Sequence, residues 1–125
     1  MWSASRQDGS AVTNFVLVAF PMLAIFVATI SITLGSYARL VLLDSTIEGA
    51  RFAALADQDI ASGIAKTRQL VAATLGAGLN VNVAASVLRI GKVESVRFVS
   101  TLGIDLIPSS YVLSASSVAT RENEY

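Results

Sequence analysis

A run of 30 residues without a charged side chain, residues 9–38, constrains the fold of this chain more than any other feature. Within it, residues 15–34 (FVLVAFPMLAIFVATISITL) are almost entirely apolar. A helix that crosses a membrane needs about 20 such residues at a rise of about 1.5 Å each. The run therefore predicts a transmembrane helix over residues 10–38.

Three other interpretations of this run stay open, and composition alone does not exclude the first, an ordinary uncleaved signal anchor. A buried helix of a soluble protein shares its apolar character, although such helices seldom run this long without a charge. A cleaved secretory signal would use Arg6 as its basic region and residues 36–38 (SYA) as its cleavage site, but its apolar core is usually only about 7–15 residues long. Because Arg6 precedes the run while Arg39 and Arg51 follow it, the basic residues do not fix its orientation.

Composition excludes several classes of chemistry. The chain has no Cys and no His, which removes a disulfide framework, a thiolate nucleophile, and the commonest general base and transition-metal ligand. Nine basic residues balance nine acidic ones, and this neutrality argues against a nucleic-acid partner. We therefore expect no catalytic residues, no cofactor and no metal site.

The residues that enter the apolar run form the first of two recognisable segments. Residues 8–15 (DGSAVTNF) resemble the processing site of a prepilin-type protein, and most closely that of the TadE-like minor pseudopilins of the tight-adherence (Flp) pilus system. That family has a short polar leader ending in Gly, then a small residue, then a Glu–Phe pair at mature positions five and six, then an apolar helix with an early Pro. The resemblance implies that Gly9 closes a leader over residues 1–9, that Ser10 becomes the mature N-terminus, and that Phe15 is the sixth mature residue.

Pro21 matches the early proline of that family. Proline removes a backbone donor and clashes with the carbonyl group four residues earlier, so a kink is expected over residues 18–21.

The second segment follows the run. Residues 48–54 (EGARFAA) are similar to the segment that follows the membrane span in the TadE-like family, and the resemblance extends from residue 9 to about residue 75. It implies that Glu48, Gly49 and Arg51 contact a neighbouring subunit. A solvated helix face with one ion pair is the alternative explanation of Glu48 and Arg51.

One position departs from the family pattern. Asn14 stands at the fifth mature position, where the family usually has Glu. That Glu is thought to pair with the N-terminal amine of a neighbouring subunit, because a lone carboxylate and a lone ammonium are each costly in lipid. Asn14 cannot neutralise a charge, so a tip or initiating position in a filament is the hypothesis that this departure favours.

Beyond the run, helical spacing continues over residues 37–56, with an apolar stripe of Leu40, Leu43, Ile47, Ala50 and Ala54.

A second helix is predicted over residues 60–75. Asp59 can cap its beginning and Gly76 can end it. Asp57 and Asp59 together would also suit a metal or acid–base site, for which capping is the simpler explanation. Ser62 and Lys66, four residues apart, fit a nucleophile and its base, so a small membrane-tethered hydrolase is a further alternative.

Three strands are predicted in the last part of the chain, over residues 80–89, 93–100 and 111–119. Gly91 and Lys92 form a turn between the first two, and residues 108–110 (PSS) form another turn. The predicted fold is thus α+β, with a long transmembrane helix that continues outside the membrane, a short second helix and a small antiparallel sheet. We expect residues 39–125 to form the extracytoplasmic domain that the resemblance implies.

These features together predict a structural subunit and not an enzyme. The resemblance implies a single-pass protein of the bacterial cytoplasmic membrane, processed by a prepilin peptidase and packed into or at the tip of a pilus. Its implied partners are that peptidase, other pilins and pseudopilins, the inner-membrane assembly proteins of the tight-adherence system and the lipid bilayer, with no nucleic acid and no small-molecule substrate. An unprocessed single-span envelope protein with a small binding domain is the alternative.

Overall fold

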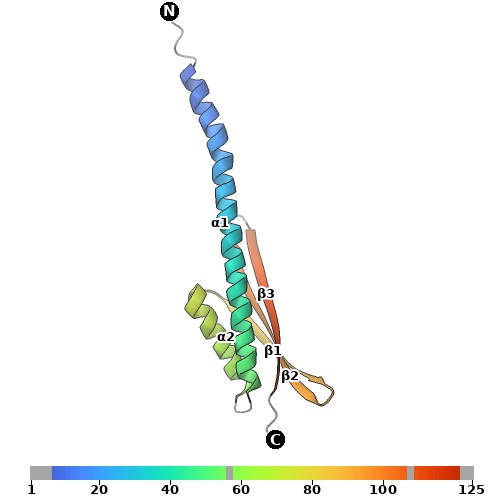
Figure 1. Cartoon of the computed structure of the whole chain (residues 1–125). Helices are drawn as coiled ribbons and strands as arrows, with labels where there is room; N and C mark the ends of the chain where they lie inside the picture. The colour runs from blue at the N-terminus through green and yellow to red at the C-terminus, as the bar shows by residue number, and fades with distance from the viewer. Residues whose placement is uncertain (1–6, 56–57, 107–108, 122–125) are drawn as a thin grey trace, which may run out of the picture. The chain divides into compact units, whose positions relative to one another are not determined.

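The structure, a computed structural model, describes residues 7–55, 58–106 and 109–121. Two helices precede three strands, which form one antiparallel sheet in the order β1-β2-β3 (Figure 1). The predicted α+β class is therefore confirmed. The elements are α1 (Gln7–Ala54), α2 (Ile60–Leu75), β1 (Val81–Ile90), β2 (Val93–Leu106) and β3 (Ser109–Thr120).

The chain divides between Ser36 and Tyr37 into two compact units. The described part of the first unit is helix alone, and none of residues 9–36 is buried. The helix continues through Pro21 without a break. Membrane helices tolerate an internal proline where the freed carbonyl groups find other donors.

The second unit begins with the last turns of α1 and continues with α2, which starts and stops where the sequence predicts. The Asp59 side chain accepts a hydrogen bond from the backbone N–H of Ser62 at 2.9 Å, so it caps the first turn. At the other end, the N–H of Gly76 donates to the carbonyl of Ala72, and the positive φ of Gly76, 110°, turns the chain out of the helix.

A two-residue turn joins β1 to β2, as the sequence predicts. Ile90 and Val93 are register partners across it, and Gly91 adopts a φ of +65° that a side chain would disfavour. Strand β2 is longer than the predicted residues 93–100, because pairing with β3 continues to Leu106. The turn predicted at residues 108–110 lies partly outside the described residues, and Ser109 begins β3.

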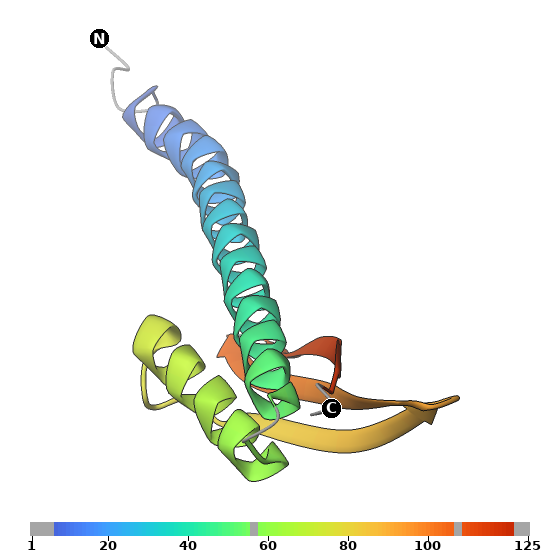
Figure 2. The same ribbon diagram turned by 60° about the horizontal axis from the view of Figure 1, so that its bottom comes forward.

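One face of the sheet carries the core of the second unit. Alternate residues of β2 are buried on this face. The C-terminal part of α1 and the whole of α2 cover them (Figure 2). Two apolar clusters result. The first joins Ala50, Ala53, Val83, Val96 and Phe98, and the second joins Leu42, Val71, Leu102 and Ala115.

The predicted apolar stripe of α1 is wrong in part. Leu40 is 65% exposed and Leu43 is 38% exposed, whereas Leu42 is fully buried. The buried face of this part of α1 consists mainly of small residues, because the helix approaches its neighbours closely. Its members are Ala38, Leu42, Ser45, Thr46, Gly49, Ala50, Ala53 and Ala54.

Two glycines allow this close approach between α1 and α2. A Cβ atom added to Gly49 would overlap the Thr67 side chain, and one added to Gly63 would lie 2.5 Å from the Ala53 Cβ and 2.9 Å from the Phe98 ring. Because only glycine leaves this space, the two backbones can pass each other directly above Phe98.

Candidate membrane-spanning and assembly site

The first unit presents a long apolar surface. The chain has one helix that is long and apolar enough to cross a membrane, among the residues that the structure describes. A contiguous apolar surface of this extent marks a membrane or a protein partner. Its exposed large side chains are Val12, Phe15, Val16, Leu17, Val18, Phe20, Met22, Leu23, Ile25, Phe26, Val27, Ile30, Ile32 and Leu34.

Four hydroxyl groups on this surface are satisfied within the helix. Thr29 donates to the carbonyl of Ile25 at 2.8 Å, and Ser31 donates to that of Val27 at 2.9 Å. Thr13 and Thr33 bond in the same way to Gly9 and Thr29. Since a polar group without a partner is costly in hydrocarbon, these internal bonds make the surface compatible with lipid.

The residues assigned to processing and assembly lie at the beginning of this helix. Gly9, Ser10, Asn14 and Phe15 are all exposed, with Phe15 at 73%. A side chain added at Gly9 would meet no other atom within 4 Å, so the position leaves room for a bound protein. Residues 1–6 of the predicted leader lie outside the described residues.

The three residues of segment 48–54 that were expected to contact a neighbouring subunit differ in exposure. Glu48 and Arg51 are exposed and form an ion pair of 3.7 Å one turn apart on α1. Gly49, in contrast, is buried against Gly63 and Thr67 of the same chain. The close packing that the sequence assigned to a neighbouring subunit at Gly49 is thus made by α2.

The residues that invited catalytic or metal interpretations are placed as follows. Asp59 caps α2, and Asp57 lies outside the described residues. Across residues 7–55, 58–106 and 109–121, no hydrogen bond joins Ser62 to Lys66, and no group of three or more acidic side chains gathers in a way that could hold a metal ion.

Sequence reasoning missed a buried polar pair in the second unit. The hydroxyls of Thr46 and Ser100 lie 2.8 Å apart, and Thr46 also bonds to the carbonyl of Leu42 at 2.6 Å. Both residues occupy inward positions between apolar neighbours. Period-2 alternation in β2 would have placed Ser100 in the core, but the sequence holds no signal for the partner of a buried hydroxyl.

A second feature that was missed is the polar groove beside β3. Arg39 and Leu43 of α1, Arg97 and Val99 of β2 and residues 114–116 of β3 line it. The residues are far apart in the sequence, so only the fold brings them together.

No family model, no curated protein and no solved structure matches this chain. The function proposed below therefore rests on the chain's own residues and geometry and on the two segments that resemble the TadE-like proteins.

Proposed function

We propose that this protein is a single-span membrane protein that acts as a TadE-like minor pseudopilin, a structural component of a tight-adherence pilus. The observation that carries the proposal is the uncovered apolar surface of α1, which begins directly after a segment that resembles a prepilin processing site. In this function Gly9 ends a leader that a prepilin peptidase removes on the cytoplasmic side, and the α+β domain lies outside the cytoplasmic membrane.

The apolar helix suits two successive environments. The hydroxyls of Thr29, Ser31 and Thr33 bond to its own backbone, so these side chains can lie in lipid with their donors paired. The same uncovered surface can later pack against the helices of other pilus subunits, because apolar side chains pack as well against protein as against lipid.

The α+β domain would supply the part of the subunit that meets other pilus proteins. Its core includes Phe98 and Leu102, which are fully buried within the chain. The exposed Glu48–Arg51 pair on α1 then remains available for a contact with a neighbouring subunit.

Processing is the direct test of the proposal. The full-length chain is produced in membranes with an active prepilin peptidase or with its inactive variant, and its intact mass is measured. The mass should fall by that of residues 1–9 only beside the active enzyme. Gly9→Leu should block the change, and the matched variant Gly35→Ala, at an open position of the same helix, should not.

Persistence of the full-length chain beside an active peptidase would overturn the pseudopilin function. It would favour the alternative, an unprocessed single-span envelope protein with a small binding domain.

Asn14 bears on the position of the subunit in the pilus. Because an amide cannot neutralise the N-terminal amine of a neighbour, we propose a tip or initiating position in place of repeated incorporation along the filament. Asn14→Glu should then change the number of pili per cell, and an unchanged number would contradict the tip position.

A further inference from the structure

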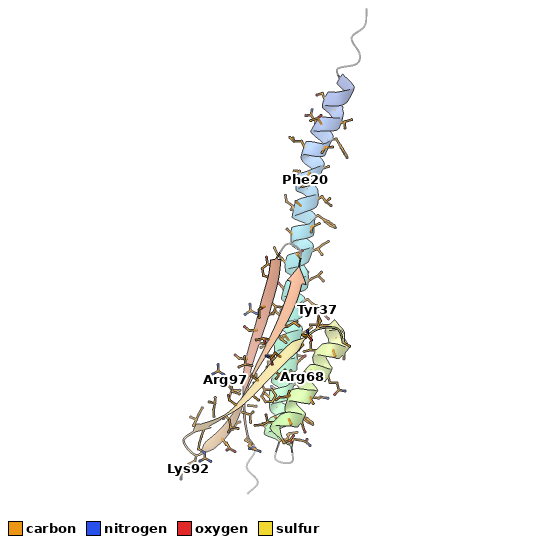
Figure 3. All side chains as sticks on the ribbon, turned by 180° about the vertical axis from the view of Figure 1, so that it is seen from behind. Phe20, Tyr37, Arg68, Lys92 and Arg97 are labelled. Atoms are coloured by element: carbon orange, nitrogen blue, oxygen red, sulfur yellow. The ribbon has the colours of Figure 1, made fainter. Side chains whose placement is uncertain are left out.

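The groove beside β3 has the chemistry of an anion-binding site. It has a volume of about 460 Å³ and lies wholly within the second unit. Its lining includes Arg39 of α1 and Arg97 of β2, together with the exposed residues Ser114 and Ser116 of β3. Figure 3 labels Arg97, which projects from the sheet into solvent.

The charges in this groove are not compensated within the described chain. In residues 7–55, 58–106 and 109–121, neither Arg39 nor Arg97 forms an ion pair, whereas Arg51, Arg89 and Arg121 each pair with a glutamate. No acidic side chain lines the groove. A guanidinium offers five donors in a planar fork that matches phosphate and carboxylate oxygens, so two arginines in the lining of one groove favour a bound anion.

The serine hydroxyls add neutral donors. Neither Ser114 nor Ser116 makes a side-chain hydrogen bond within the part of the chain that the structure describes. Leu43 and Val99 form the apolar part of the lining. An occupant with an anionic head and an adjoining apolar part would satisfy both kinds of lining.

We propose that this groove binds the phosphate group of an anionic phospholipid. Arg39 follows Leu34, the last of the almost entirely apolar residues 15–34, by five positions in the same helix, which corresponds to a rise of about 7.5 Å. A basic side chain this close to the end of a span lies at the depth of the lipid headgroups, where anionic lipids attract it. The proposal rests on α1 spanning a membrane and is independent of pilus function.

The neighbouring groove on α1 lacks this property. Arg51 lines a groove of about 550 Å³ with Ile47, Leu55 and residues 117–120, but its guanidinium already pairs with Glu48. The difference between the two grooves makes Arg39 and Arg97 the residues to test.

The experiment uses the full-length chain in lipid nanodiscs made of phosphatidylcholine alone or of equal parts of phosphatidylcholine and phosphatidylglycerol. Native mass spectrometry then measures how much phosphatidylglycerol stays bound after release from the disc. The double variant Arg39→Gln/Arg97→Gln should reduce this amount about tenfold or more, as expected for the loss of charge-assisted hydrogen bonds.

The matched control is Arg68→Gln/Lys92→Gln, which removes two positive charges outside the groove (Figure 3). It should retain phosphatidylglycerol as the unmodified chain does. Equal loss in both double variants would mean diffuse attraction to the membrane and would overturn the proposal, as would unchanged retention in the Arg39/Arg97 variant.

Two further measurements separate other sources of the same signal. If inorganic phosphate fully displaces phosphatidylglycerol and binds the groove with the same affinity as the lipid, the groove is a site for free phosphate. Binding of a polyglutamate peptide that depends on both arginines, with no retained phosphatidylglycerol, would show an acidic protein partner. A Ser114→Ala/Ser116→Ala variant, which keeps both charges, should weaken lipid retention by a smaller factor, and no weakening would exclude the hydroxyls from the site.

Discussion

The hydroxyl oxygens of Thr46 on α1 and Ser100 on β2 lie 2.8 Å apart, and neither residue is exposed to solvent. Each residue sits between members of the two apolar clusters, Thr46 between Leu42 and Ala50, and Ser100 between Phe98 and Leu102. Thr46 has one hydroxyl proton and two close oxygens, so it can donate to Leu42 and accept from Ser100. The pair thus fixes the register of α1 on the sheet.

Thr46→Val should therefore destabilise the second unit. The variant keeps the shape of the side chain but leaves the Ser100 hydroxyl buried without its partner, which costs about 1–3 kcal/mol. The free energy of unfolding of the full-length chain in detergent micelles measures the effect. Thr46→Val/Ser100→Ala should lose less than the sum of the two single variants, since no hydroxyl is then left unpaired. Thr29→Val, on the exposed part of α1, is the control and should change stability little.

The crossing of α1 and α2 predicts a second loss of stability. Gly63→Ala would bring the new Cβ within 2.9 Å of the Gly49 carbonyl oxygen, the Ala53 Cβ and the Phe98 ring. Overpacking of this kind costs about 1–3 kcal/mol, and neither backbone can move without disturbing Phe98. The midpoint of thermal unfolding should fall for Gly63→Ala and Gly49→Ala alike.

Gly35→Ala serves as the control for both glycine variants. Apart from its chain neighbours and the adjoining backbone of its own helix, no atom lies within 4 Å of an added Cβ at that position, and alanine favours a helix over glycine. Equal effects of all three variants on thermal unfolding would contradict the packing role of Gly49 and Gly63.

Much of this fold follows from local signals in the sequence. The beginning of α2 was predictable because Asp59 is a capping residue, and its end because Gly76 can take a positive φ. The turn at Gly91 was predictable for the same reason. The length of the apolar run likewise predicted a helix, and none of residues 9–36 of that helix is buried.

The buried face of α1 was not predictable in the same way. The pattern favoured large residues such as Leu40 and Leu43, but the close crossing with α2 selects small ones such as Gly49 and Ala53. Which face of a helix is buried depends on the neighbour that it meets, and this neighbour is distant in the sequence. The proposed anion-binding groove depends in the same way on the fold, which brings Arg39 and Arg97 into the lining of one groove beside β3.

The cap of α2 predicts a dependence of stability on pH. Hydrogen bonds from the side chain and the backbone N–H of Ser62 hold the pKa of the Asp59 carboxyl below its ordinary value. A carboxyl whose pKa is lower in the folded chain than in the unfolded chain stabilises the folded state. This contribution is complete when the pH is above the pKa of the unfolded chain, and it is lost as the pH falls through the lower pKa of the folded chain. The amides in the first turn of α2 should therefore lose protection from hydrogen exchange as the pH falls from neutral to below about 4.

Asp59→Asn separates the charge from the hydrogen bond. Asparagine also caps helices but does not titrate, so amide protection in this variant should vary less over the same pH range. Asp44→Asn, at an exposed position in the C-terminal part of α1, should leave the pH dependence of the first turn of α2 unchanged. A parallel pH dependence in the unmodified chain and in Asp59→Asn would exclude the cap as its origin.

Glu94 holds the C-terminal end of β3 against β2. Its carboxylate lies 3.2 Å from the Arg121 guanidinium and 3.9 Å from that of Arg89, and its backbone carbonyl accepts the Arg121 N–H at 2.8 Å. Glu94→Gln should therefore loosen the end of β3 and increase hydrogen exchange at residues 118–121. Partly exposed pairs are worth only about 0.2–1 kcal/mol, so the global stability should fall by no more than that, and the loss should shrink in high salt. Glu48→Gln breaks a more exposed pair and should leave β3 unaffected; increased exchange in β3 in that variant would mean that general charge, and not the Glu94 contacts, secures the strand.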